Sequence, residues 1–556
     1  MKIKSSIIVL KQYYWVLPIA LFSILVFLGS QMHPLWADEA ETALFARNIV
    51  EYGIPKGWDG VNIMGYHDAF VLNKDLVNNK TPWLQYYLTA GSFKVFGESP
   101  FSARLPFILI SLLFLPVFFF LVKNQTGNKL TAFLSTTILA LSVPFIMYSY
   151  TARYYSVVIF AGTVFFFSGL QLTDKKLWPK IAFILAGTIF LYAHYLTFIL
   201  FTTPSFIGSL VYIILQTRSF KKVLQWILYW IAGGICIAIL FLPWFLWLSL
   251  FGGSQRVLVF DPFSYQQSLR FLNILIYSLN INNILPFGLV GILLVDLILG
   301  IKYKKEIAIS LCILLIIAIE IFSSAILDGF IYSDTIFTAF RYHIVLFPLI
   351  AVLFGILFKK VFSFNKIVFS LLFGVFLLSN LFAFTTPTSL IADYIAEISN
   401  PYQTPDTAVA EYLNENAKDN DTVILSLERD YEPLIFQLQK KLLFVDRITP
   451  AKARFFAKNG NRLPRYVSNF LGEPDWVILY SKLPYDGTYA TELPHQIPPQ
   501  VNLVQDYDEI ILPVFFLDMT RPEIHWHSFY EITPAYDEQI FIYHKKSFDK
   551  TQDKSS

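Results

Sequence analysis

The chain has 556 residues, of which 55% are hydrophobic and 15% are charged, and its mean hydropathy is +0.53. An average soluble domain has about 25% charged residues, so this composition excludes a soluble globular enzyme and predicts a polytopic membrane protein. The formal net charge of +3 is too small to indicate a nucleic-acid partner. Cys236 and Cys312 both lie in apolar runs, so the cysteines predict neither a disulfide framework nor a metal knuckle.

About eleven apolar runs are long enough to cross ~30 Å of hydrocarbon as helices. The fifth run is short, and we also consider it as a re-entrant segment. The predicted spans are 14–32, 101–122, 130–148, 154–171, 181–195, 197–216, 224–249, 280–300, 306–327, 342–359 and 366–385.

The basic residues of the connections between these spans predict the orientation of the chain. Alternate turns are rich in lysine and arginine, whereas the opposite short turns hold only Arg153, Arg256, Arg270 and Arg341. The positive-inside rule therefore places the N terminus in the cytoplasm, and an odd number of spans places the C terminus outside. The predicted cytoplasmic residues are Lys2, Lys4, Lys11, Lys123, Lys129, Lys175, Lys176, Lys180, Arg218, Lys221, Lys222, Lys302, Lys304, Lys305, Lys359, Lys360 and Lys366. An alternative for residues 1–37 is a cleaved secretory signal, but a retained signal-anchor helix is simpler because many further spans follow.

A long outer loop, 33–100, separates the first two spans. Its pattern predicts short interfacial helices at 39–52 and 82–96. Trp36, Trp58 and Trp83 are expected at the level of the lipid headgroups.

The tail, 400–556, has a higher charge density than the rest of the chain. Strand-like runs alternate there with helical stretches at 406–417 and 450–458, which predicts a small extracytoplasmic α/β domain. The strand-like runs are 422–427, 442–445, 476–480, 510–516 and 539–543. The predicted organisation is thus a transmembrane module, 1–390, followed by a soluble domain, 400–556.

Several motifs at the outer face occur in a particular order. Asp38-Glu39 directly follows the first span, where acidic residues are also expected simply because they stabilise the first turn of a helix. Further along the chain come Asn79-Lys80-Thr81-Pro82-Trp83, then Phe96-Gly97, and then Arg104-Leu105-Pro106 at the start of the second span.

This order resembles that of the GT-C class of integral-membrane glycosyltransferases, in the branch of the protein O-mannosyltransferases and the lipid A aminoarabinose transferases. In that branch the first outer loop carries an Asp-Glu pair, a Lys-Pro-Pro-like element, and then Phe-Gly and Arg-Leu-Pro. The resemblance continues through Arg153-Tyr154-Tyr155, His194-Tyr195 and Arg341-Tyr342, and covers the membrane half of the chain. Together with the span pattern it implies a GT-C-like fold of about eleven transmembrane helices with an outer α/β domain.

The resemblance implies transfer of a monosaccharide from a polyprenyl-phosphate donor, with inversion at the anomeric carbon. The acceptor is a lipid, a glycan or a protein on the extracytoplasmic face of what we expect to be a bacterial inner membrane. Polyprenyl phosphate is a good leaving group that needs cations rather than a strong acid. The expected roles are general base for Asp38, orientation or sugar binding for Glu39, donor-phosphate binding for Lys80, Arg153 and Arg341, and substrate binding for Tyr154, His194 and Tyr342.

Two departures from the aminoarabinose transferases leave the sugar open, hexose or pentose. Those enzymes tend to have an acidic residue before the loop lysine, where this chain has Asn79. They also tend to have an aspartate after the third span, where residues 153–160 contain no acid.

Other features have competing interpretations. Glu320 is an ionisable residue inside an apolar run and is a functional candidate outside the catalytic set. Arg256 and Arg270 are either donor contacts or ordinary loop arginines. His525 and His527 have the spacing of two metal ligands on one strand, but the sequence has no third ligand nearby. We therefore assign no metal and no cofactor. A divalent cation at the catalytic site remains an open alternative.

Three alternatives to this function stay open. A transporter or flippase for a lipid-linked sugar would have paired broken helices and internal symmetry, which the sequence lacks. A non-catalytic membrane scaffold would keep the fold and use the tail to bind a partner. An envelope polysaccharide polymerase or ligase is a third possibility, without the expected first-loop Asp-Glu pair.

Overall fold

The computed structural model describes residues 14–32, 34–62, 64, 72–73, 75–79, 82–251, 304–326, 340–379, 391–399, 404–425, 431–444, 473–479, 501–513 and 539–546. These residues belong to two compact units. Unit 1 comprises the described residues within Met1–Met32 and Thr81–Asn400, and unit 2 those within His33–Lys80, Pro401–Thr520 and Ile532–Ser556.

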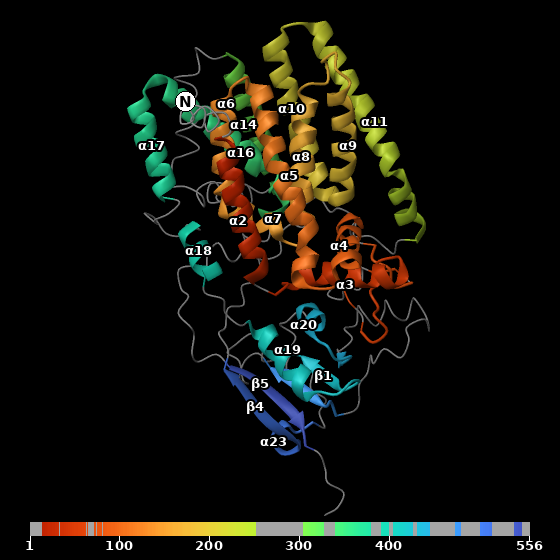
Figure 1. Cartoon of the computed structure of the whole chain (residues 1–556). Helices are drawn as coiled ribbons and strands as arrows, with labels where there is room; N and C mark the ends of the chain where they lie inside the picture. Colours follow the sequence, from red (N-terminus) through yellow and green to blue (C-terminus); the bar gives the residue numbers. More distant parts are fainter. Residues whose placement is uncertain are drawn as a thin grey trace, which may run out of the picture. The chain divides into compact units, whose positions relative to one another are not determined.

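Unit 1 is helical (Figure 1). Its helices are α2 (Val16–Met32), α4 (Leu84–Phe96), α5 (Pro100–Thr126), α6 (Lys129–Ala140), α7 (Val143–Tyr150), α8 (Tyr155–Gly169), α9 (Trp178–Ala193), α10 (Tyr195–Thr217), α11 (Phe220–Phe251), α14 (Lys304–Ile326), the 3-10 turn η1 (Phe340–Tyr342), α16 (Leu346–Phe364), α17 (Lys366–Ser379) and α18 (Ile391–Ser399). Each predicted span coincides with one of these helices, or with the pair α6 and α7, except 280–300, which lies outside the described residues.

The described helices include four that are long and apolar enough to cross a membrane: α5, α10, α16 and the stretch Phe220–Trp247 of α11. The helices α2, α8, α9 and α17 contain shorter apolar stretches. The break falls in the third predicted span rather than the fifth, because α6 and α7 meet at 71° whereas α9 is a regular helix. Pro144 explains this break, since proline has no backbone N–H to continue the hydrogen bonds of α6 and is favoured in the first turn of a new helix.

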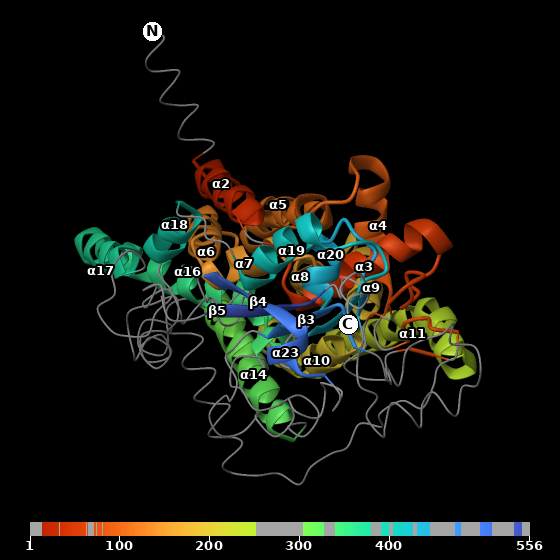
Figure 2. The same cartoon turned by 90° about the horizontal axis from the view of Figure 1, so that it is seen from below.

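Close helix packing holds unit 1 together (Figure 2). The helix α14 packs against α10 and α16, and α16 packs against α6. Glycines allow this approach: a Cβ atom on Gly355 of α16 would meet the hydroxyl of Ser135 on α6, and one on Gly208 of α10 would lie 2.8 Å from the Cys312 carbonyl oxygen of α14. Such close contacts through small residues are typical of packed membrane helices.

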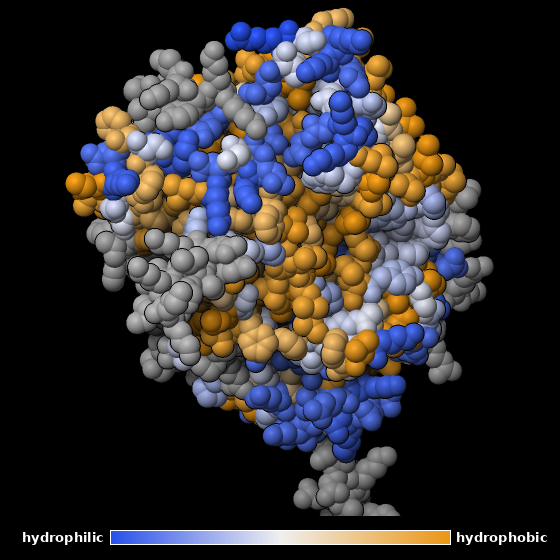
Figure 3. Space-filling view, turned by 45° about the horizontal axis from the view of Figure 1, so that its top comes forward, coloured by the Kyte–Doolittle hydropathy of each residue, from blue (hydrophilic) through white to orange (hydrophobic). Residues whose placement is uncertain are grey.

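The exposed surface of these helices is apolar over a large area (Figure 3). An apolar surface is stable against lipid hydrocarbon but not against water, so it agrees with a membrane-embedded bundle. The large exposed side chains there include Leu109, Leu113, Leu185, Leu228, Ile235 and Ile239.

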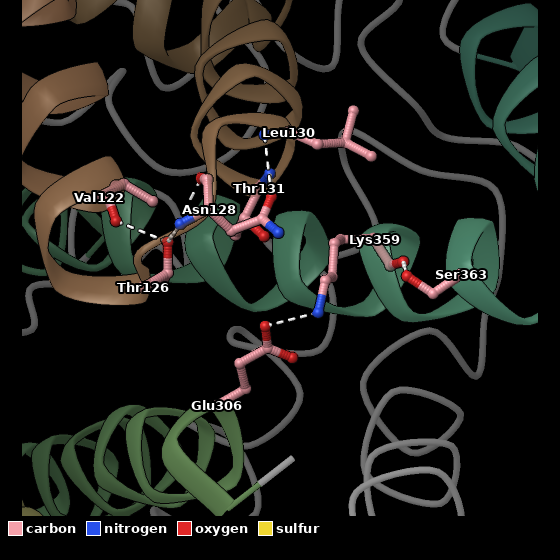
Figure 4. A network of polar contacts seen from close by, with 8 residues as sticks. All are labelled: Val122, Thr126, Asn128, Leu130, Thr131, Glu306, Lys359 and Ser363. Atoms are coloured by element: carbon pink, nitrogen blue, oxygen red, sulfur yellow. Dashed lines mark hydrogen bonds and ion pairs between the residues drawn. The ribbon is translucent and has the colours of Figure 1, made fainter. Parts of the chain in front are cut away.

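The turn between α5 and α6 shows how local sequence ends one helix and begins the next (Figure 4). Gly127 closes α5 in the left-handed conformation, with φ of 70°. The side-chain oxygen of Asn128 then accepts hydrogen bonds from the backbone N–H groups of Leu130 and Thr131, at 2.9 and 3.0 Å. Glycine and asparagine are preferred at these two positions for these reasons.

Unit 2 contains a five-stranded mixed sheet with the order β2-β1-β3-β5-β4. The strands β2, β1 and β3 are parallel, whereas β5 pairs antiparallel with both β3 and β4. The strands are β1 (Thr422–Leu425), β2 (Leu443–Phe444), β3 (Trp476–Leu479), β4 (Tyr507–Pro513) and β5 (Gln539–Lys545), and the helices are α3 (Ala37–Tyr52), α19 (Pro405–Asn416), α20 (Glu432–Gln437) and α23 (Leu503–Asp506). All five strand-like runs of the tail therefore form strands, and 406–417 forms α19, while 450–458 lies outside the described residues.

The first outer loop is divided between the two units. Both interfacial helices form, but α3 belongs to unit 2 and α4 to unit 1. Within unit 2, α3 packs against α20, and the guanidinium of Arg47 lies over the Phe436 ring at 5.2 Å. Residues 34–62 thus belong to unit 2, together with the strands of the tail.

Candidate active site

The N-terminal turn of α3 carries the acidic pair. Glu39 is buried, and its carboxylate accepts a hydrogen bond from the backbone N–H of Trp36 at 3.4 Å. Asp38 is half-buried, and its backbone carbonyl accepts the hydroxyl of Thr42 at 2.9 Å. Both carboxylates lie where the helix macrodipole stabilises negative charge. Glu39 therefore has an N-terminal capping contact, and Asp38 is the more accessible of the two.

The three predicted substrate-binding residues meet in unit 1. The imidazole of His194 stacks on the Tyr154 ring with centroids 4.1 Å apart and planes 18° apart. The ring centroid of Tyr342 lies 5.7 Å from that of His194, with the two planes 35° apart. The three side chains come from the start of α8, the start of α10 and the turn before α16, so the bundle assembles them from distant parts of the sequence.

His194 also begins a helix. Its Nδ1 atom accepts a hydrogen bond from the backbone N–H of Thr197 at 3.2 Å and lies 2.8 Å from the Thr197 hydroxyl. Since Nδ1 acts as the acceptor for this N–H group, a neutral ring carries its proton on Nε2. The capping contact thus fixes both the orientation of the ring and the atom that can donate a hydrogen bond.

Two predicted phosphate-binding arginines lie in turns of the same unit. Arg341 is half-buried in η1, with its guanidinium 5.3 Å from the Tyr342 ring centroid and 3.5 Å from the Tyr342 hydroxyl. Arg153 is half-buried in the turn directly before Tyr154, and its backbone N–H donates to the carbonyl of Thr151 at 2.7 Å. The structure therefore brings Arg341 to Tyr342 and the aromatic stack, and places Arg153 next to Tyr154 in the chain.

Gln85 is a residue of this region that sequence reasoning missed. It lies on α4, is 1% exposed, and its side-chain oxygen accepts the backbone N–H of Tyr154 at 3.0 Å. Its Nε2 atom is buried and makes no hydrogen bond within the part of the chain that the structure describes. This hydrogen bond connects α4 to the start of α8. The sequence indicated a role for Gln85 only in that it is a polar residue within an apolar helix.

Glu320 is fully buried on α14 and lies 2.9 Å from Nδ1 of His343. His343 directly follows the Arg341-Tyr342 pair, and it too is buried. The sequence marked Glu320 because an ionisable side chain in an apolar run is costly, but gave no sign of its partner.

Some candidate residues lie outside the described residues: Lys80, Arg256, Arg270, His525 and His527. Among the residues that the structure does describe, no group of three or more histidine, cysteine, aspartate or glutamate side chains is arranged to hold a metal ion. Arg104, part of the Arg-Leu-Pro motif, is buried and donates to the carbonyl of Ser30 at 2.9 Å, so it fastens α5 to α2.

The mostly helical structure, with several helices that could cross a membrane, and the sheet-containing C-terminal region are those of a polytopic membrane protein with a GT-C-like fold. No protein-family model matches the chain, and a search of curated proteins finds no match.

Solved structures of one GT-C enzyme align with nearly the whole chain. The crystal structure of ArnT from Cupriavidus metallidurans bound to undecaprenyl phosphate aligns with a TM-score of 0.57 and 13% identity, over 96% of this chain and 98% of that one. The apo structure of the same protein aligns with a TM-score of 0.55 and 14% identity, over 87% of this chain and 95% of that one. At 13–14% identity, this structural similarity shows the fold alone.

Proposed function

We propose that this protein is a glycosyltransferase that moves a monosaccharide from a polyprenyl-phosphate donor to a lipid, glycan or protein acceptor. The observation that carries this proposal is the cluster of Tyr154, His194 and Tyr342 with Arg341, assembled by three turns of a bundle with the GT-C-like fold. The undecaprenyl phosphate in the ArnT structure supports a lipid of this class as the donor.

Donor binding requires recognition of a phosphate diester and of a sugar ring. Arg341 and Arg153 supply guanidinium groups, which bind phosphate through two parallel N–H donors, and Lys80 is proposed as a further cation. The faces of Tyr154 and Tyr342 provide apolar surface for the C–H groups of a sugar, and the Nε2–H of His194 provides a directed donor. Cations at the leaving phosphate stabilise the charge that develops there as the glycosidic bond breaks.

The proposed reaction is a single displacement. An acceptor hydroxyl oxygen forms a bond to the anomeric carbon, the bond from that carbon to the phosphate oxygen breaks, and polyprenyl phosphate leaves with the electron pair. Asp38 accepts the hydroxyl proton as general base, and attack opposite the leaving group inverts the anomeric carbon. Glu39, which is buried and caps the same helix, orients this turn.

We further propose that the reaction takes place on the extracytoplasmic side of a bacterial inner membrane, with the N terminus in the cytoplasm. Arg153, His194 and Arg341 lie in turns at one end of the helices that they join. The basic turns after α8 and α10 lie at the other ends of those two helices, as expected for the cytoplasmic side. In this proposal 1–390 acts as the transmembrane module and 400–556 as an outer domain.

The test is a transfer assay with the purified full-length protein in lipid. The protein is incubated with a panel of polyprenyl-phosphate sugars and an envelope-lipid extract, and free polyprenyl phosphate is measured by mass spectrometry. We expect release from one donor that depends on the extract and falls by about 10²–10⁴-fold in Asp38→Asn. The matched control is Glu51→Gln, which neutralises an exposed carboxylate on the same helix and is expected to keep full activity.

Two outcomes would contradict the proposal. Translocation of donor lipid without release of polyprenyl phosphate would favour a flippase. Tight binding without release or translocation would favour a non-catalytic scaffold.

A further inference from the structure

Two buried carboxylates of α14 form ion pairs with the turn before α16 and with α16 itself. Near one end of α14, Glu320 pairs with His343 at 2.9 Å. Near the other end, Glu306 pairs with Lys359 at 2.8 Å, and Figure 4 shows this second pair. The two glutamates are fourteen positions apart, which is about 21 Å along a helix and close to a whole number of turns. They therefore lie on nearly the same face of α14, and both are buried.

The two pairs differ in what surrounds them. Glu306 and Lys359 lie at the end of α16 that is distant from the aromatic cluster. His343, in contrast, is adjacent in the chain to Tyr342, whose ring packs on His194, and follows Arg341 by two residues. Only the Glu320–His343 pair is connected to the candidate donor-binding residues.

A buried pair of this kind contributes little to stability on balance, because removing two charges from water offsets most of their attraction. It does, however, restrict the orientation of the imidazole, since the carboxylate accepts the Nδ1–H bond from one direction. The carbonyl of His343 also accepts the N–H of Leu346 at 2.9 Å, at the first residue of α16. The position of His343 is thus determined on its side chain by α14 and on its backbone by α16.

We propose that Glu320 is a positioning residue: through His343 it holds the Arg341–Tyr342 turn in the conformation that binds the phosphate of the donor lipid. The inference rests on the proposed function, which it deepens by adding a buried support to the donor-binding turn. Glu320 itself is 0% exposed, so in this proposal it acts only through His343.

The experiment compares Glu320→Gln with Glu306→Gln in the full-length protein. Each substitution replaces one buried carboxylate of α14 by an amide of the same shape, so Glu306→Gln reports what the loss of a buried ion pair of α14 does by itself, at a distance from the aromatic cluster. Binding of undecaprenyl phosphate is measured by native mass spectrometry, and the donor KM and kcat are measured in the transfer assay. We expect Glu320→Gln to weaken lipid-phosphate binding and raise the donor KM about tenfold with little change in kcat, because one charge-assisted hydrogen bond is lost.

Further variants separate positioning from folding. Glu320→Asp keeps the carboxylate and is expected to recover part of the affinity, whereas His343→Gln is expected to weaken binding as much as Glu320→Gln. The double variant is expected to bind no more weakly than either single one, because the two residues act through one contact. Glu306→Gln is expected to bind undecaprenyl phosphate as the unmodified protein does.

The inference is overturned if Glu320→Gln binds the lipid phosphate normally, if Glu306→Gln weakens binding equally, or if the unmodified protein does not bind it. Failure of the proposed function has a different signature. In that case the unmodified protein binds undecaprenyl phosphate, and Glu320→Gln weakens this binding, but no donor is turned over.

Discussion

Asn62 and Phe444 are 382 residues apart in the chain, yet the backbone N–H of Phe444 donates to the side-chain oxygen of Asn62 at 2.9 Å. The amide nitrogen of the same side chain donates to the carbonyl of Leu442, also at 2.9 Å. Asn62 therefore hydrogen-bonds the backbone of β2 much as a neighbouring strand would. This contact fastens the first outer loop to the sheet within unit 2.

Removal of this contact is expected to loosen unit 2. Asn62→Ala leaves two buried backbone groups of the β2 region without partners, which we expect to cost about 2 kcal/mol. The measurements are the midpoint of thermal unfolding and the rate of limited proteolysis within 401–556. The control is Asn416→Ala, which removes an exposed amide that bonds only to its own helix, at Tyr412. Equal effects of the two substitutions would show that the Asn62 contact contributes nothing specific.

The double role of His194 can be separated by two substitutions. Asparagine is a good N-terminal cap but cannot stack, whereas phenylalanine stacks but cannot cap. We therefore expect His194→Phe to lower stability by about 1 kcal/mol, and His194→Asn to keep stability while raising the donor KM. Thermal unfolding and donor kinetics of both variants check this, and the opposite pattern would contradict the assignment of Nδ1 as a cap.

Arg341 is expected to bind phosphate through the geometry of its guanidinium and not through charge alone. Arg341→Lys keeps the positive charge but cannot form a bidentate hydrogen bond to the phosphate, so the donor KM is expected to rise about tenfold. The control is Arg218→Lys, the same change at an exposed site that ends α10 at the opposite end of the helix from His194. If both variants bind donor as the unmodified protein does, Arg341 is not a phosphate ligand.

Gln85 is expected to support the Arg153–Tyr154 turn through a single hydrogen bond. Gln85→Met keeps the volume of the side chain but leaves the buried N–H of Tyr154 without its acceptor, at a cost of about 1–3 kcal/mol. Thermal unfolding measures this loss. Thr89→Val serves as the control, since the hydroxyl of Thr89 is also buried on α4 but bonds only to the Gln85 carbonyl of its own helix. A larger loss in Thr89→Val than in Gln85→Met would contradict the role of Gln85.

Local patterns in the sequence predicted most of the secondary structure. Apolar runs of membrane length became the helices of unit 1, and alternating runs in the tail became β1 to β5. These features depend on residues close together in the chain, since a helix or a strand segment buries its apolar side chains with a fixed local period. The end of α16 was less predictable. Lys359 and Lys360 were predicted to lie in a cytoplasmic turn, but both lie inside the helix and are buried. Burial of Lys359 is possible because it forms an ion pair with Glu306 of α14.

The candidate site was predicted residue by residue but not as an arrangement. The motifs identified Tyr154, His194 and Tyr342 separately, and only the packing of α8, α10 and α16 brings their rings together. The pairing of Glu320 with His343 and of Asn62 with β2 likewise depends on which surfaces meet after the helices and strands have formed. Composition and local period alone determined that the protein is a polytopic membrane protein with an α/β tail. The tertiary structure decided which residues are partners, because hydrogen bonds and ring contacts between distant residues leave no periodic pattern in one sequence.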